Sequence, residues 1–151
     1  MSFLVRLHTL SFGIQARLNR AMSVGLNGVW LALLQREDLH AVSSAVYSKR
    51  TFYHTPEYNR SGLWEWETRA INEHFASCSR LLVAAAGGGR EVLALRKRGF
   101  AVDGFEAHPG LVHFANEFLQ EEGHGNGIQL APWDGCPDYP HVYDGVIIGW
   151  G

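Results

Sequence analysis

Cysteine, long uncharged segments and a strong excess of one charge are all scarce in this sequence of 151 residues. Two cysteines, Cys78 and Cys136, are too few for a disulfide framework, so we expect free thiols in a reducing cytoplasm. The longest uncharged stretch within the first 50 residues, 21–35, is shorter than the ~20 apolar residues that a membrane-spanning helix needs. The sequence therefore predicts a cytoplasmic protein that does not enter a membrane.

The net charge limits the partners as well. It is −2 at pH 7, whereas domains that bind nucleic acid in general carry a strong basic excess. Residues 1–50 contain six basic and two acidic residues, and the rest of the chain contains seven and thirteen. An acidic partner or RNA could meet the basic N-terminal region, but solvated helix faces explain these charges more simply. Nucleic acid is therefore not the partner that the sequence favours.

Metal-binding and nucleophilic motifs are absent from the sequence. The eight histidines include no zinc-binding pattern, and His108 and His113 are five residues apart, which places them on different faces of a helix. No arrangement of serine, histidine and aspartate indicates a catalytic triad. The sequence thus predicts no metal site, and it leaves the catalytic residues unknown.

Helical periodicity dominates the first half of the chain. Apolar residues recur at intervals of three and four over residues 4–22, and shorter helical patterns cover 29–35, 38–49 and 63–76. No linker long enough to separate two domains interrupts them. We expect residues 1–79 to form an N-terminal helical cap region.

Short apolar segments alternate with helical ones after residue 79. The continuous apolar run LLVAAA (81–86) is typical of a strand buried on both faces, and a glycine turn followed by a helix succeeds it. Strands, helices and turns at this spacing predict βαβ units and a parallel sheet, here over residues 80–151 with strand order 3-2-1-4. The remaining predicted elements are a strand over 100–106, a helix over 111–122, and strands over 128–133 and 142–150.

A triple glycine, 87–89, separates the first predicted strand from its helix. Such a turn lets a ligand approach the backbone closely, and the helix N-terminus offers unpaired N–H groups to negative charge. The dinucleotide fingerprint G-x-G-x-x-G/A needs a small third residue. That position is Val92 when the count starts at Gly87 and Arg90 when it starts at Ala85. A dinucleotide-dependent oxidoreductase is therefore disfavoured.

Two carboxylates follow the ends of the next predicted strands. Glu106 ends the second strand beside the glycine turn, and its two acceptor oxygens suit the two hydroxyls of a ribose. Asp134 follows Trp133 after the third strand, where a carboxylate next to an aromatic ring suits the amine of a base. The alternatives are a solvated strand end for Glu106 and a simple turn for Asp134-Gly135.

Four segments, LLVAAAGGGREVLAL, GFEAHPGLVHFA, LAPWDG and YDGVIIGWG, resemble in this order and spacing the first half of a class I S-adenosylmethionine-dependent methyltransferase, over about residues 57–150. The resemblance implies a Rossmann-like α/β fold, S-adenosylmethionine as cofactor with S-adenosylhomocysteine as product, and methyl transfer to an unidentified acceptor. It places Glu106 on the ribose hydroxyls and Asp134 on the adenine amine. The cofactor-binding residues that it implies are Ala85, Gly87, Gly88, Gly89, Glu106, Ala107, His108, Trp133, Asp134, Gly149 and Trp150.

Two positions depart from the family's pattern. Val83 stands where members often carry an acidic residue, and Ala85 stands at the first glycine of the loop. Contacts to the amino group of the cofactor would then need backbone atoms or another side chain, for which Tyr58 and Glu67 are candidates. Aromatic residues of the preceding segment that could form a lid or pack in a core are Tyr53, Tyr58, Trp64 and Trp66.

The length of the chain conflicts with the resemblance. Residues 80–151 hold four predicted strands, whereas the resemblance implies a domain with a seven-stranded sheet. We therefore expect a truncated domain. The fourth strand is apolar and would lie at an open edge, which favours a homodimer or larger assembly through that edge. The leading prediction is the cofactor-binding portion of a methyltransferase. The alternative is a truncated or degenerate, non-catalytic module that acts by binding or association.

Overall fold

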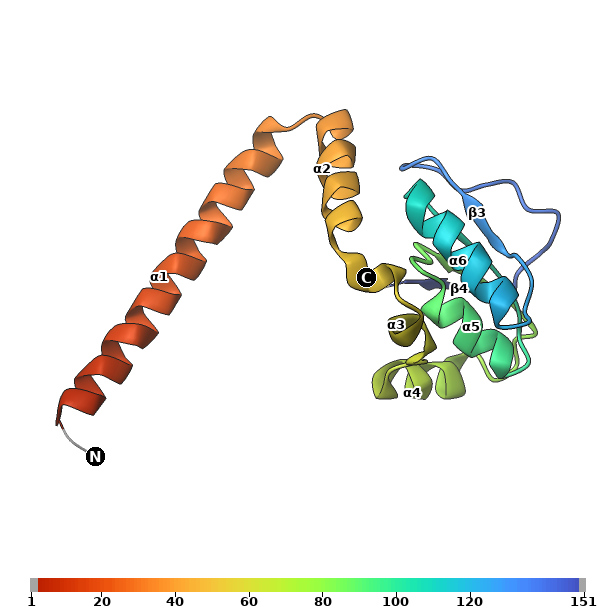
Figure 1. The fold of residues 1–151 in the computed structure, drawn as a ribbon, viewed down its shortest axis with the longest axis horizontal. Helices are drawn as coiled ribbons and strands as arrows, with labels where there is room; N and C mark the ends of the chain where they lie inside the picture. The colour runs from red at the N-terminus through yellow and green to blue at the C-terminus, as the bar shows by residue number, and fades with distance from the viewer. Residues whose placement is uncertain (1–2, 150–151) are drawn as a thin grey trace. The chain divides into compact units, whose positions relative to one another are not determined.

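The computed structural model describes residues 3–149, which begin with helices and end in an α/β sheet (Figure 1). The helices of the first part are α1 (Phe3–Leu33), α2 (Arg36–Lys49), the short 3-10 helix η1 (Thr51–His54), α3 (Pro56–Arg60) and α4 (Glu65–His74). The elements that follow are β1 (Arg80–Ala84), α5 (Arg90–Lys97), β2 (Ala101–Glu106), α6 (Pro109–Glu121), β3 (Ile128–Leu130) and β4 (Gly145–Ile148). The chain divides into two compact units, Met1–Val42 and Ser43–Gly151.

Helix α1 is one continuous helix of 31 residues where the periodicity predicts a break before residue 29. Gly25 and Gly28 lie inside it, and each costs about 1 kcal/mol relative to alanine, which the helix-forming residues around them offset. Leu18 and Met22 are more than half exposed along this helix. None of the helices in residues 3–149 is long and apolar enough to cross a membrane.

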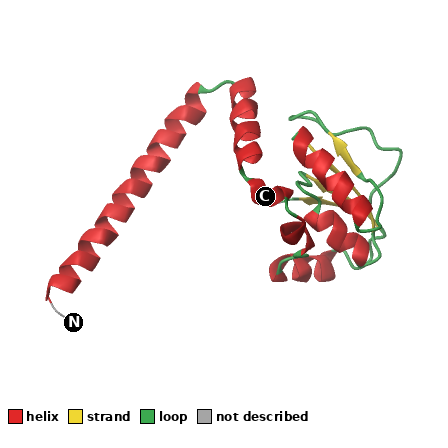
Figure 2. Ribbon diagram, in the orientation of Figure 1, coloured by secondary structure: helices red, strands yellow, loops and turns green. Residues whose placement is uncertain are grey.

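The four strands form one parallel sheet in the order β3-β2-β1-β4, which confirms the predicted α/β class and strand order. Figure 2 shows the strands, in yellow, together with the helices of the C-terminal part of the chain. Leu81, Leu82 and Val83 of β1 are all buried, as expected for a central strand that is covered on both faces. Strands β3 and β4 are shorter than their apolar segments suggest. Pro132 has no N–H to donate, which limits β3, and β4 begins only after Asp144, whose side chain binds the start of β1.

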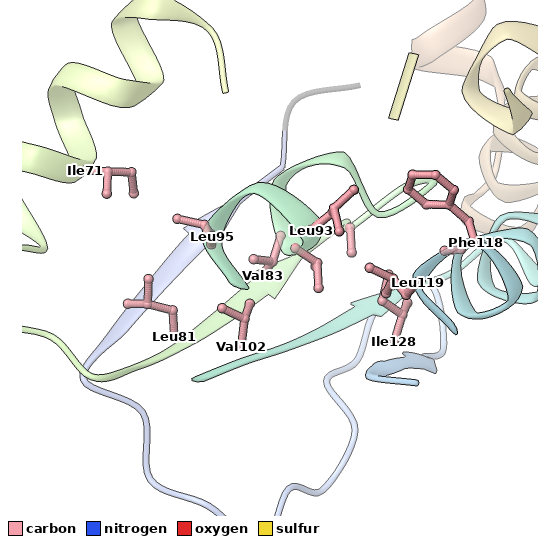
Figure 3. Close-up of a cluster of buried hydrophobic side chains, with 12 residues drawn as sticks. Ile71, Leu81, Val83, Leu93, Leu95, Val102, Phe118, Leu119 and Ile128 are labelled. Atoms are coloured by element: carbon pink, nitrogen blue, oxygen red, sulfur yellow. The ribbon is translucent and has the colours of Figure 1, made fainter. Parts of the chain in front are cut away.

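Helices α5 and α6 pack against the sheet, and the main core lies between these layers (Figure 3). Leu81 and Val83 of β1, Leu93 and Leu95 of α5, and Leu119 of α6 belong to one cluster of buried side chains. Each of these side chains is at most 2% exposed, and burial of one leucine or valine contributes about 1.5–3 kcal/mol. Ile71 of α4 joins the same cluster, so α4 belongs to the sheet's own core.

The segment between β3 and β4 is anchored to β2 through two tyrosines. Tyr139 donates its hydroxyl hydrogen to the carbonyl oxygen of Gly104 at 2.6 Å. Tyr143 donates to Asp103 Oδ2 at 2.9 Å. Asp144 then accepts from the backbone N–H groups of Ser79 and Arg80, at 2.7 and 2.8 Å, which aligns the start of β4 with the start of β1.

Candidate functional site

The turn after β1 is held in a conformation that few residues adopt. Gly87 and Gly89 have φ angles of 54° and 94°, in the left-handed region. Ala85 has a φ of 52° and is the one non-glycine residue with a positive φ among residues 3–149. An alanine in this region costs about 1–2 kcal/mol, and such strain clusters at ligand sites. The first loop position thus keeps the backbone conformation of a glycine although its residue is alanine.

Gly88 is the tightest position of this turn. A Cβ added there would overlap the carbonyl oxygen of Tyr53 and the side-chain amide of Asn59, so no larger residue fits without displacement. Asn59 is 1% exposed and its Nδ2 donates to the carbonyl oxygens of Tyr53 and Thr55, both at 2.9 Å. The segment before α4 therefore supports one side of the glycine turn.

The carboxylate of Glu106 connects the glycine turn to the turn after β2. Its Oε2 accepts from the backbone N–H of Gly87 at 3.0 Å. Its Oε1 accepts from the N–H groups of Ala107 and His108 at 2.8 and 2.9 Å. A carboxylate has about four lone-pair positions, so Glu106 retains acceptor capacity for a ligand hydroxyl.

His108 acts as the N-terminal cap of α6. Its Nδ1 accepts from the N–H of Leu111 at 3.3 Å, which assigns the ring hydrogen to Nε2. Nε2 lies 3.0 Å from the hydroxyl oxygen of Ser48 in α2, so the imidazole donates to that oxygen. Both ring nitrogens are thereby occupied, and the His108 side chain is not among those that line the cleft described next.

A cleft of about 300 Å³ opens beside Glu106 at the carboxyl ends of the strands. Clefts at this edge of a parallel sheet, where the strand order reverses, are the usual ligand sites of such folds. The predicted site residues that line it are Ala85, Gly87, Glu106, Ala107, Trp133 and Gly149. Gly88, Gly89, His108 and Asp134 are not among its lining residues, and Trp150 lies outside the described residues.

Gly149 brings the end of β4 against the glycine turn. Its N–H donates to the carbonyl oxygen of Ala84 at 2.7 Å, and an added Cβ would overlap the carbonyl oxygen of Ala85. Gly89 instead faces the core, where a Cβ would contact Ala115 and Ile128 at 3.5 Å. The glycines of the site thus divide into those that admit a ligand and those that permit close packing.

Helix α2 contributes two lining residues that sequence reasoning missed, Ser43 and Tyr47. They are four residues apart and therefore share one face of the helix. Burial raises the pKa of the Tyr47 phenol, and the nearby Tyr53 and the negative charge of Glu106 raise it further. The sequence signal that could have indicated these two residues is the spacing of four between a polar and an aromatic side chain. The other lining residues that the sequence did not indicate are Phe105, Ala131, Pro132 and Gly135.

Glu67, a sequence candidate for contact with the cofactor's amino group, has other partners. Its Oε2 accepts from the backbone N–H of Trp64 at 2.6 Å, and both of its oxygens accept from Arg90. It does not line the cleft beside Glu106. Within residues 3–149, no group of three or more histidine, cysteine or acidic side chains is arranged to hold a metal ion.

Comparison with known proteins supports the fold. No protein-family model and no curated protein matches the chain. A solved structure described by the conversion of a disulfide bond into a thioacetal group during echinomycin biosynthesis is similar, with a TM-score of 0.56 and 21% identity over 72% of this chain and 46% of that chain. The N-terminal domain of EvdMO1, solved with SAH bound, is 27% identical over 43% of this chain and 28% of that chain, with a TM-score of 0.40. The likeness to the structure from echinomycin biosynthesis supports the Rossmann-like α/β fold. The chain spans less than half the length of either solved protein.

Proposed function

We propose that the cleft beside Glu106 binds S-adenosylmethionine and that the chain is the cofactor-binding portion of a class I methyltransferase. The observation that carries this proposal is the Glu106 carboxylate, which joins the glycine turn at Gly87 to the turn after β2. A carboxylate at this position, with acceptor capacity left, suits the two hydroxyl donors of a ribose.

The other residues of the cleft suit the remaining parts of such a cofactor. The backbone at Ala85, Gly87 and Gly149 lines the cleft without a bulky side chain, which suits the methionine part. Ala107 and Trp133 supply apolar surface for adenine. Asp134 follows Trp133, and we assign it to the adenine amine. In the same proposal Gly88, Gly89 and His108 hold the turns in place. The assignment of Trp150 to the methionine part falls on a residue outside the described range.

The cofactor supplies a methyl group that is already activated on a sulfonium, for in-line transfer to a nucleophile. The chain's own contribution is to bind and orient, because holding two reactants in line removes most of the entropic barrier. The cleft's largely apolar walls, with Phe105, Pro132 and Trp133, exclude water around the cofactor. The proposal names no methyl acceptor and no residue as a general base.

Calorimetry with S-adenosylhomocysteine tests the proposal. We expect this product to bind the wild-type chain and NAD not to bind. Glu106→Gln removes the charge that holds the ribose hydroxyls, and loss of hydrogen bonds to a charged group costs about 1.5–3 kcal/mol, or about 10–100-fold in affinity.

Glu117→Gln is the matched control. Glu117 lies in α6, where its side chain is exposed and pairs with His113 at 3.5 Å, and it does not line the cleft, so its neutralisation should leave affinity unchanged. S-adenosylhomocysteine that binds no better than NAD overturns the cofactor assignment. Equal affinities of Glu106→Gln and the wild type overturn the assignment of the ribose. Methyl transfer itself then requires product formation with a panel of acceptors.

We also propose that the chain self-associates as a homodimer or larger assembly through β4. This strand pairs with β1 on one side only, and Val146 and Ile148 are 57% and 79% exposed. An open apolar edge of this kind is a template for another strand. In light scattering we expect Ile148→Lys to dissociate the assembly and Val142→Lys, 90% exposed but outside β4, to leave it intact. A monomeric wild-type chain contradicts this.

Two further assignments belong to the proposal. Residues 80–151 carry the nucleotide-binding half-domain and residues 1–79 its helical cap, from which Tyr47 reaches the cleft. The location is cytoplasmic, in keeping with the free thiols of Cys78 and Cys136. Because the sheet's core includes Ile71 and the second compact unit begins at Ser43, limited proteolysis should leave a protected fragment that begins near residue 43. Cell fractionation should find the chain in the cytoplasmic fraction.

A further inference from the structure

Arg90, the first residue of α5, is a buried cation directly after the glycine turn. It is 2% exposed. Removal of a guanidinium from water is costly unless its charge and its donors are matched inside the protein. The partners of this side chain therefore show what the burial achieves.

The two terminal nitrogens of the Arg90 guanidinium donate to Glu67, to the backbone of the preceding segment and to Glu91. Nη1 donates to Glu67 Oε2 at 2.9 Å and Nη2 donates to Glu67 Oε1 at 2.7 Å, which is the bidentate geometry of an arginine–carboxylate pair. Nη1 also donates to the carbonyl oxygen of Gly62 at 2.7 Å, and Nη2 donates to Glu91. The guanidinium carbon lies 5.0 Å from the centre of the Trp64 ring, a cation–π contact.

Glu67 extends this network into α4. It is 8% exposed, and its Oε2 also accepts from the N–H of Trp64 at the start of that helix. The side chains of Arg90 and Glu67 therefore close the N-terminus of α4 and join it to the N-terminus of α5.

Glu91 is the second carboxylate beside Arg90. Burial raises the pKa of Glu91, while the positive charge of Arg90 acts in the opposite direction.

Two contacts hold the glycine turn. Gly88 within it packs against Asn59, and Arg90, which follows it directly, pairs with Glu67. The last residue of the turn, Gly89, donates its N–H to Ala86 at 3.0 Å and accepts from Leu93 at 2.9 Å, so the turn and the first turn of α5 are one hydrogen-bonded unit. A shift of the α5 N-terminus would move Gly87, and with it the hydrogen bond to Glu106 at 3.0 Å.

We infer that Arg90 is a positioning residue: by its bidentate pair with Glu67, it holds the glycine turn in the geometry that binds the cofactor, so that affinity at the cleft depends on α4. Arg90 does not line the cleft, and its effect passes through the backbone of the turn. The inference about affinity rests on the proposed function, whereas the inference about the turn does not.

Arg90→Lys is the informative variant because it keeps the charge and loses the planar fork. Arg98→Lys is its matched control: Arg98 caps the other end of α5 and also contacts α4, through Thr68 at 3.3 Å and Asn72 at 3.5 Å, far along the helix from the turn. We expect S-adenosylhomocysteine to bind Arg90→Lys at least tenfold more weakly than wild type and to bind Arg98→Lys unchanged. Both affinities are measured where circular dichroism shows folded protein.

A second variant keeps the test decisive if Arg90→Lys does not fold. Arg90→Met with Glu67→Gln and Glu91→Gln removes all three charges of the network together, and replacement of a whole buried network preserves stability better than removal of one partner. A folded triple variant should show the same loss of affinity. Wild-type affinity in either folded Arg90 variant, or an equal loss in Arg98→Lys, overturns the inference.

Hydrogen exchange of the ligand-free protein separates this inference from the proposed function. We expect the Gly89 amide to exchange faster in Arg90→Lys than in wild type and at an unchanged rate in Arg98→Lys. If the wild type does not bind S-adenosylhomocysteine but the Gly89 amide responds in this way, the cofactor assignment fails and the positioning of the turn stands. Unchanged exchange at Gly89 in Arg90→Lys overturns the positioning role itself.

Discussion

Glu106 and Gly87 meet across the mouth of the cleft: the carboxylate oxygen Oε2 accepts the Gly87 N–H at 3.0 Å, 19 residues along the chain. The other oxygen of the same carboxylate caps the turn that leads to α6. One side chain therefore links the turns that follow β1 and β2. The same side chain is the one that we assign to the ribose, so structural and binding roles coincide at this position.

Substitutions of two adjacent glycines should separate stability from binding. Gly88→Ala places a Cβ against Tyr53 and Asn59, and overpacking of this kind costs about 1–3 kcal/mol of unfolding free energy. Gly87→Ala meets no atom within 4 Å and costs about 1–2 kcal/mol for its left-handed φ, but it adds a methyl group to a residue that lines the cleft. Urea denaturation and calorimetry measure the two effects.

The opposite ranking contradicts this assignment of the two glycines. If Gly87→Ala unfolds at lower urea than Gly88→Ala, then backbone strain outweighs packing in the turn. If Gly88→Ala alone weakens the binding of S-adenosylhomocysteine, then the cofactor lies on the Asn59 side of the turn and not in the cleft beside Glu106.

Ala85→Gly should remove the strain at the first loop position. The φ of 52° costs alanine about 1–2 kcal/mol, and part of this gain is offset because glycine has more freedom in the unfolded chain. We expect the unfolding free energy to rise by up to about 1 kcal/mol. A clear loss of stability in urea denaturation would falsify the strained conformation at Ala85.

Tyr47 provides a test of the contribution of α2 to the cleft. Its ring lines the site, so Tyr47→Ala should weaken the binding of S-adenosylhomocysteine about tenfold, the value of a stacked aromatic contact of ~1–3 kcal/mol. Tyr47→Phe keeps the ring and should bind nearly as wild type. Val46→Ala, one residue away and not in the cleft lining, is the control. Equal binding by Tyr47→Ala and Val46→Ala would place the cofactor away from α2.

The sheet and the glycine turn could be predicted from the sequence because their signals are local. The apolar run at Leu81–Val83 and the glycines after it depend on neighbours in the chain, and the parallel order follows from the alternation of strands and helices. Glu106 could be placed for the same reason, since the end of a strand fixes the edge of the sheet where its side chain lies.

Contacts between segments that are distant in the sequence could not be predicted in this way. The Arg90–Glu67 pair joins residues 23 positions apart, and Tyr47 lines the same cleft as Glu106 from a helix that periodicity alone does not orient. His108 follows the cleft residue Ala107 in the sequence, but both of its ring nitrogens form hydrogen bonds elsewhere, with Ser48 and with the start of α6. Side-chain direction depends on tertiary packing, which a pattern of residue types does not specify.

Alkaline pH should loosen the segment between β3 and β4. Burial, followed by the charges of Asp103 and Cys136, raises the pKa of Tyr139 from 10.0 to about 12. Burial and the hydrogen bond to Asp103 also raise the pKa of Tyr143. The folded state therefore favours the protonated phenols. The stability that they contribute is fully present below pH 10, the unfolded value, and is lost as pH rises toward about 12, because the unfolded chain releases these protons first.

Urea denaturation between pH 8 and pH 11.5 measures this effect. In the wild type we expect the unfolding free energy to fall above about pH 10, the unfolded pKa of tyrosine. The double variant Tyr139→Phe, Tyr143→Phe has no phenol at either position, so it should be less stable at pH 8, where the bonds to Gly104 and Asp103 are missing, but should lose less stability on going to pH 11.5. Parallel curves for the two proteins would show that other groups cause the alkaline loss and that these two hydroxyls do not anchor the segment to β2.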